Sequence, residues 1–141
     1  MQYRQFDRLP KQAKEIREKV FVEEQGFREE FDSVDNFATH IMAFDGEKAV
    51  ATCRFFKQDD YYLIDRIAVT KEYRGRNIGR EMLQEAEEHI KTIGGREIRI
   101  HAQLSAEGFY AKLGYISTGE YDFDEGCKHI WMSKIICSLY F

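Results

Sequence analysis

The chain has 141 residues, of which 43% are hydrophobic and 33% are charged, and its formal net charge is −4. A chain of this size and composition buries a core without metals or disulfides, so we expect one domain over residues 1–141. The acidic balance argues against a nucleic-acid partner. We also find no apolar run that would span a bilayer and no leader at Met1, which favours the cytoplasm and no membrane partner.

The three cysteines, Cys53, Cys127 and Cys137, are widely spaced and odd in number. They show no metal-knuckle or redox spacing, so we expect reduced packing residues, with a catalytic thiol as the less favoured alternative. The histidines and cysteines form no zinc-like cluster along the sequence. We therefore expect no metal site.

The first half of the chain predicts an edge strand, two helices and an antiparallel meander. Pro10 suits the first turn of a helix, because apolar residues follow it at helical spacing. A second short helix is expected over residues 22–27, followed by an acidic loop that either is simply solvated or attracts a cationic amine. The strands expected here are residues 3–6, 38–44, 49–57 and 61–69, the last three joined by tight polar turns.

The second half predicts helices that alternate with strands. The longer helix has one apolar face and ends at Gly94 and Gly95. Because this helix separates two strands, those strands should run parallel. The elements expected are a helix over residues 78–91, a strand over 98–102, a helix over 106–114 and strands over 115–118 and 128–136.

The most informative segment is the run from Tyr73 to Arg80, which joins an expected strand to an expected helix. The first N–H groups of a helix lack intrahelical partners, and the helix dipole places partial positive charge there. Gly75 and Gly79 allow ligand oxygens to approach the backbone, while the arginines add charge-assisted hydrogen bonds. The segment predicts a phosphate or pyrophosphate site, the alternative being a plain glycine turn with solvated arginines.

This loop matches neither standard nucleotide-binding motif. A P-loop ends in Gly-Lys-Ser/Thr, and the dinucleotide fingerprint has three spaced glycines followed by an acidic residue about 20 positions later. Here Asn77 stands between only two glycines. The antiparallel meander also counts against a nucleotide-binding protein of another fold.

Two segments, at residues 67–79 and 103–115, carry a resemblance to the GNAT family of N-acetyltransferases. The match of the whole pattern spans nearly the entire chain. The family's cofactor loop reads Arg/Gln-x-x-Gly-x-Gly/Ala after a strand ending in Ala-Val, and here Ile-Ala-Val at 67–69 precedes Arg-Gly-Arg-Asn-Ile-Gly at 74–79. Asn77 departs from the family's usual glycine, although asparagine tolerates left-handed backbone angles. The second family segment, Asn-x-x-Ala-x-x-x-Tyr-x-x-x-Gly-Phe, is similar to the stretch containing Gln103, Ala106, Phe109, Tyr110, Lys112, Leu113, Gly114 and Tyr115.

Further residues match the pattern of a bacterial subgroup of small acetyltransferases, whose members have no assigned acceptor. The subgroup resemblance therefore supplies no substrate. The matching residues are Val20, Phe21, Val22, Glu23, Glu24 and Gln25, then Asp32, Asp35, Ala38 and His40, and later Ala102, Gln103, Gly126, His129 and Met132.

The resemblance implies a mixed α/β (α+β) fold: a central, mostly antiparallel sheet of about seven strands flanked by about four helices, with a splayed parallel pair forming the cofactor cleft. It also implies acetyl-CoA as cosubstrate and no metal. Lys112 either approaches a coenzyme phosphate or is a solvent-exposed helix lysine. The cofactor residues implied are Ile67, Ala68 and Val69 for the pantetheine arm, Arg74, Gly75, Arg76, Asn77, Ile78, Gly79 and Arg80 for the pyrophosphate, and Gln103, Phe109 and Lys112.

The chemistry implied is direct attack of a neutral primary amine on the thioester. Tyr110 matches the family's general acid, although an aromatic side chain packed on the sheet is the alternative. A backbone N–H near residues 67–69 would stabilise the oxyanion. We rank Glu24 first as the base, ahead of Asp65, His40, His129 or a water molecule.

The acceptor is expected to be an amine of a small molecule or of a protein, with Phe21, Glu24, Arg66 and His129 as candidate binding residues. Arg66 equally suits a carboxylate partner, and His129 equally suits a strand position satisfied by hydrogen bonds. A second hypothesis is a module that senses coenzyme A with little catalysis. The apolar residues 137–141 either extend the last strand or cover a partner subunit, as in a homodimer.

Overall fold

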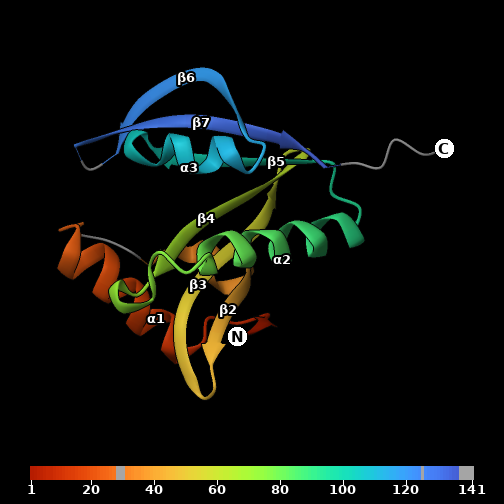
Figure 1. Ribbon diagram of the computed structural model, residues 1–141. Coiled ribbons are helices and arrows are strands. Elements are labelled where there is room, and N and C mark those ends of the chain that lie inside the picture. Colours follow the sequence, from red (N-terminus) through yellow and green to blue (C-terminus); the bar gives the residue numbers. More distant parts are fainter. Residues whose placement is uncertain (28–30, 125, 137–141) are drawn as a thin grey trace. The chain divides into compact units, whose positions relative to one another are not determined.

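The fold is described from a computed structural model that defines residues 1–27, 31–124 and 126–136 (Figure 1). The apolar residues 137–141 and part of the acidic loop lie outside the described residues, so the expectations for them stay predictions. The chain forms two compact units. The first unit contains Met1–Phe56 and Ile64–Glu88, and the second contains Lys57–Leu63 and His89–Phe141.

The strands hydrogen-bond in the order β1-β2-β3-β4-β5-β7-β6 and are mostly antiparallel. The exception is β4 (Tyr61–Val69) beside β5 (Glu97–Gln103), which run parallel and pair Tyr62 with Ile98 and Leu63 with Arg99. This confirms the mixed, seven-stranded sheet and its parallel pair, while the splayed cofactor cleft stays a prediction. The described residues contain three α-helices rather than about four.

The first unit has a core in which α1 packs against β2, because the apolar side of the helix carries Ala13 and Ile16. These residues contact a cluster that includes Met42, Phe44 and Ala68 from the strands. The elements of this unit are β1 (Gln2–Phe6), α1 (Lys11–Arg17), β2 (Thr39–Asp45), most of β3 (Lys48–Gln58), most of β4, and most of α2 (Ile78–Thr92), together with the short helices η1 (Glu18–Glu24), η2 (Ser33–Asn36) and η3 (Lys71–Tyr73).

The second helix expected over residues 22–27 is present with different bounds: it is η1, which begins earlier, at Glu18, and ends at Glu24, close to Gly26. No glycine or proline lies between Pro10 and Gly26, so the chain continues from α1 directly into η1, a π-helix. Gln25 donates its N–H to the Val20 carbonyl at 3.2 Å, the five-residue spacing of a π-helix. Gly26, with a φ of 75°, then ends the helical segment.

A buried ionic network connects α1, η2 and β3. Arg17 donates to both carboxylate oxygens of Asp35 at 2.7 and 3.0 Å, and Arg54 donates to Asp35 at 2.9 Å. Arg54 also binds Asp65 at 2.7 Å and Asp32 at 2.7 Å. Arg17 and Arg54 are almost completely buried, so removing one partner would leave an uncompensated charge, at a cost of about 3–5 kcal/mol.

The second unit contains β5, α3 (Glu107–Lys112), β6 (Ile116–Asp124) and β7 (Cys127–Ile135), coloured from teal to blue in Figure 1. β5 alternates between buried and half-buried residues, as its sequence predicts. β6 extends well beyond the expected residues 115–118, because a register shift between Ser117 and Tyr121 takes up Gly119, whose φ is 86°. Its exposed, acidic residues lack the alternation that reveals a strand in a sequence.

None of the helices in the described residues combines the length and the apolar composition needed to cross a membrane.

Candidate functional site

The expected anion loop lies in the first unit and leads directly into α2. Gly75 and Asn77 both adopt left-handed backbone angles, with φ of 78° and 63°. The Asn77 carbonyl accepts the N–H of Glu81 at 3.0 Å and so begins the helical hydrogen bonding. The N–H groups of the helix before Glu81 have no intrahelical acceptor, which is the feature on which the predicted anion site depends. Asparagine therefore makes the turn that the family makes with glycine.

Tyr73, immediately before the loop, is anchored to the β2–β3 hairpin. Its hydroxyl donates to Asp45 at 2.7 Å, and this hydrogen bond raises the pKa of Tyr73. Lys48 lies 5.3 Å from the centre of the ring, and Arg76 lies 4.8 Å from it. The aromatic ring thus holds one loop arginine by a cation–π contact.

Arg74 contacts two of the other predicted site residues. Its Nη2 donates to a carboxylate oxygen of Glu24 at 2.8 Å, and its Nε donates to the Val69 carbonyl at 2.9 Å. Both charged side chains are partly exposed. The structure thus brings together the predicted base, the cofactor loop and the end of the predicted cofactor strand.

The backbone of β4 is distorted just before the predicted cofactor residues. Arg66 has a φ of 51°, a strained angle for a residue other than glycine inside a strand. Its guanidinium lies 3.3 Å from Asp32 and 3.5 Å from Asp65, so the carboxylate pairing considered for Arg66 is present. Beyond the strand, the buried Thr70 hydroxyl has no hydrogen-bond partner among the described residues. Such groups are often completed by a ligand or a water molecule.

The remaining first-unit candidates are buried or half-buried. Phe21 belongs to the core cluster and stacks on Phe27 with ring centres 6.4 Å apart. His40 is fully buried, its Nε2 lies 3.2 Å from the Asp35 carbonyl, and burial lowers its pKa. Asp65 is bound by two nitrogens of Arg54, at 2.7 and 3.1 Å. The acceptor role of Phe21 stays a prediction.

The second unit carries the other predicted residues on β5, α3 and β7. Tyr110 is 8% exposed and makes edge-to-face contacts with Phe109 and Tyr115, whose ring centres lie 5.1 and 6.2 Å away. Phe109 and Lys112 are exposed, and Gln103 ends β5. Their roles in binding and catalysis stay predictions.

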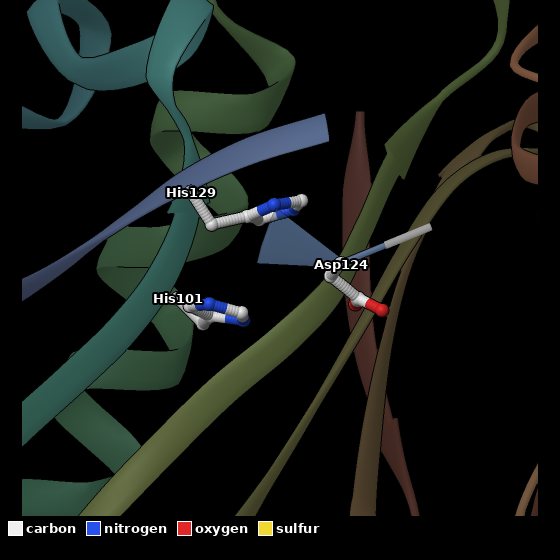
Figure 2. Close-up of side chains that lie close together, drawn as sticks. All are labelled: His101, Asp124 and His129. Atoms are coloured by element: carbon white, nitrogen blue, oxygen red, sulfur yellow. The ribbon is translucent and has the colours of Figure 1, made fainter. Parts of the chain in front are cut away.

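His129 lies in a group of side chains that the sequence analysis missed. Potential ligand atoms of His101, Asp124 and His129 all lie within 4.8 Å of one another, and Figure 2 shows the two imidazole rings extending side by side next to the carboxylate. The residues come from β5, β6 and β7, so their proximity depends on strand pairing. This group could have been predicted only from the pairing register of the three strands, and the sequence does not reveal that register.

Comparison with known proteins assigns the family. The family model described as "Acetyltransferase (GNAT) domain" matches residues 7–136. The chain is 36% identical over 127 residues to the uncharacterised N-acetyltransferase YjcF of Bacillus subtilis (strain 168), covering 88% of this chain and 91% of that protein.

Two solved structures have similar folds. A candidate N-acetyltransferase from Lactobacillus plantarum superposes with a TM-score of 0.86 at 28% identity, covering 96% of this chain and 99% of that one. An aminoglycoside 6'-N-acetyltransferase complexed with coenzyme A superposes with a TM-score of 0.78 at 16% identity, covering 100% of both chains, and shows the fold alone. Because the family model spans most of the chain and a relative exceeds 30% identity over nearly all of it, the chain belongs to the GNAT family of acetyltransferases.

Proposed function

We propose that the protein transfers an acetyl group from acetyl-CoA to a primary amine of a small molecule or of a protein. The observation that carries this proposal is the loop from Arg74 to Arg80, whose left-handed turns lead into the first N–H groups of α2. A chain of the GNAT family with an anion site at this place suits the pyrophosphate of coenzyme A. The coenzyme A complex of the structurally similar aminoglycoside acetyltransferase supports the same ligand.

The proposed reaction is direct transfer. The neutral amine nitrogen attacks the thioester carbonyl carbon, a C–N bond forms and the C–S bond breaks. A backbone N–H of residues 67–69 would stabilise the oxyanion that develops, as preorganised donors do in other acyl transfers. The leaving thiolate takes the phenolic proton of Tyr110, and the proton lost by the amine goes to a base.

Glu24 remains the proposed base. Because Glu24 binds Arg74, cofactor binding at Arg74 would also change the state of the base. A carboxylate that already accepts hydrogen bonds from an arginine must exchange that partner before it takes up the amine proton. In the proposal, the coenzyme pyrophosphate binds Arg74 and replaces Glu24. Binding of the cofactor would thereby release the base.

An amine-panel assay tests the proposal. Protein and acetyl-CoA are incubated with polyamines, aminoglycosides, amino acids and lysine peptides, and release of the free coenzyme thiol is followed with a thiol reagent. Amine-dependent release that falls in a Tyr110→Phe variant supports the enzyme. Coenzyme binding without release from any amine of the panel would favour the sensor hypothesis instead.

A further inference from the structure

We propose that His101, Asp124 and His129 form a binding site for a divalent transition-metal ion, with Zn²⁺ as the preferred probe. The site shares only His129 with the residues considered for acetyl transfer, where His129 is a candidate acceptor residue and a lower-ranked candidate base. The ligand set of two imidazoles and one carboxylate is typical of zinc and other first-row metals that keep a further coordination position open. The inference does not depend on the proposed reaction.

Strand register places all three side chains on one face of the β5-β7-β6 sheet. His129 of β7 is the partner of Gln103 on β5 and of Asp122 on β6. Side chains two residues apart on a strand share a face, so His101 lies on the side of Gln103, and Asp124 on the side of Asp122. Each strand therefore contributes one ligand.

Both histidines are held in the way that metal-binding histidines are usually held. The His101 Nε2 lies 2.5 Å from a carboxylate oxygen of Asp122, and the His129 Nδ1 lies 2.9 Å from the Cys127 carbonyl. A ligating histidine ordinarily donates its other ring N–H to a carboxylate or a backbone carbonyl, which fixes the tautomer and the ring orientation. With these two nitrogens donating, His101 keeps the Nδ1 lone pair and His129 keeps the Nε2 lone pair for an ion.

The orienting carboxylate is itself fixed. Asp122 also accepts a hydrogen bond from the Trp131 indole at 3.4 Å, and the Trp131 ring stacks on His101 with centres 4.5 Å apart. His101 also stacks on His129, again at 4.5 Å and with 28° between the ring planes. The carboxylates of Asp122 and Asp124 therefore lie beside the two imidazoles, an arrangement of nitrogen and oxygen atoms that suits a cation.

Metal binding requires a small closure of the three ligands. A tetrahedral ion with bonds of about 2.1 Å has its ligand atoms about 3.4 Å apart, compared with the present limit of 4.8 Å. The exposed Asp124 side chain can move inward, and small adjustments of the imidazole rings that keep their hydrogen bonds to Asp122 and Cys127 can bring the three ligand atoms closer. An ion held in this way would join three strands.

Titration of the untagged, metal-free protein with Zn²⁺ and Co²⁺ tests the site. We expect calorimetry to give one bound ion per chain. Bound Co²⁺ should also show the stronger visible d–d absorption of a cobalt ion that is no longer coordinated octahedrally by water. His129→Gln and Asp124→Asn should each weaken binding by about 100-fold or more, and Asp122→Asn by roughly 10- to 100-fold, because it orients His101. If the His129→Gln variant does not fold because His129 is buried, Asp124→Asn still tests the site, since Asp124 is exposed and its substitution should not disturb the core.

The matched control is His89→Gln, which removes a histidine of α2 outside the group and should leave the affinity unchanged. Zn²⁺ should also raise the melting temperature of the wild type and of His89→Gln but not that of Asp124→Asn. Absence of saturable binding would overturn the site. Binding that survives Asp124→Asn and His129→Gln, or that falls equally in His89→Gln, would overturn it as well.

Discussion

Arg74 and Tyr110 are the side chains on which the proposed reaction depends most. Arg74 binds the Glu24 carboxylate and the Val69 carbonyl in the structure, so its guanidinium is already directed by the elements that would surround a cofactor. Tyr110 is packed between two aromatic rings, which limits its motion. A positioned phenol can donate a proton to a leaving thiolate with little reorganisation.

Tyr110→Phe should lower kcat by about 100-fold, because general acid catalysis typically contributes two or more orders of magnitude. The dissociation constant for coenzyme A should change little, since only the hydroxyl is lost. Tyr115→Phe is the matched control: it removes a hydroxyl from the adjacent buried ring at a position where the family itself has phenylalanine. Equal turnover in both variants would remove the acid role from Tyr110.

Glu24→Gln should have opposite effects on binding and turnover. Without the carboxylate, Arg74 loses its ionic partner and should bind the coenzyme pyrophosphate more tightly, by about two- to fivefold for a partly exposed pair. Turnover should fall because the amide cannot accept the amine proton. Calorimetry and steady-state kinetics measure the two quantities. Glu23→Gln, the same change one residue earlier, should affect neither, and tighter binding without loss of turnover would exclude Glu24 as the base.

At the scale of elements, strand β4 and its short connection to α2 each contain one unusual backbone position. Arg66 is left-handed within the strand, and Asn77 is left-handed immediately before the helix. Such angles persist only where the surrounding structure holds them, and they are often found at functional sites. The connection is further fixed by Tyr73 on Asp45.

The Asn77 angle can be tested by substitution. Asn77→Val should weaken coenzyme A binding by about 5- to 30-fold, because a β-branched residue pays about 1–2 kcal/mol for the left-handed angle. Asn77→Gly should bind at least as tightly as the wild type. Asp59→Val imposes the same strain at φ 53° in the β3–β4 turn and should leave the affinity for coenzyme A unchanged. Equal affinities for Asn77→Val and Asn77→Gly would show that binding does not use this turn.

At the scale of the whole molecule, the sequence predicted the order of the strands along the chain and the parallel pair, because periodicity and turn residues are local signals. It also indicated the turn that leads into α2, since Gly75 and Asn77 are close in sequence, while anion binding by this loop stays a prediction. The π-helix was missed because its sequence looks like any helical segment.

The remaining features depend on contacts between distant residues. The full length of β6 was hidden by its acidic, exposed residues and its bulge at Gly119. The group of His101, Asp124 and His129 requires the register of three strands, and the network of Arg17 and Arg54 requires the packing of a helix on a sheet. Neither is encoded in a local pattern.

The buried network predicts how the stability of the molecule depends on pH. Burial lowers the pKa of His40 below its usual value of 6.5, so below that pH the unfolded chain binds a proton that the folded chain does not, and the free energy of unfolding falls. Burial alone would raise the pKa of Asp35, but Arg17 and Arg54 outweigh it and lower the pKa from 3.8 to about 2. The stabilisation from Asp35 is therefore complete above about pH 4 and is lost as the pH falls toward 2.

Urea unfolding at a series of pH values measures this dependence. We expect a gradual loss of stability below pH 6.5 and a further loss below pH 4. His40→Gln should remove the first decline and retain the second, because the glutamine amide can still donate to the Asp35 carbonyl without titrating near neutral pH. A wild-type stability that is constant between pH 7 and pH 4 would contradict the buried, neutral state of His40.

The most direct test of the account is the melting temperature of the protein with acetyl-CoA, ATP or NAD added separately. A ligand at about 100 times its dissociation constant stabilises the folded state by about 2.7 kcal/mol, which corresponds to a rise of about 5–10 °C in a chain of this size. We predict that rise with acetyl-CoA and none with ATP or NAD at the same concentration. No rise at millimolar acetyl-CoA, or an equal rise with all three ligands, would contradict the claim that this chain is an acetyl-CoA-dependent acetyltransferase.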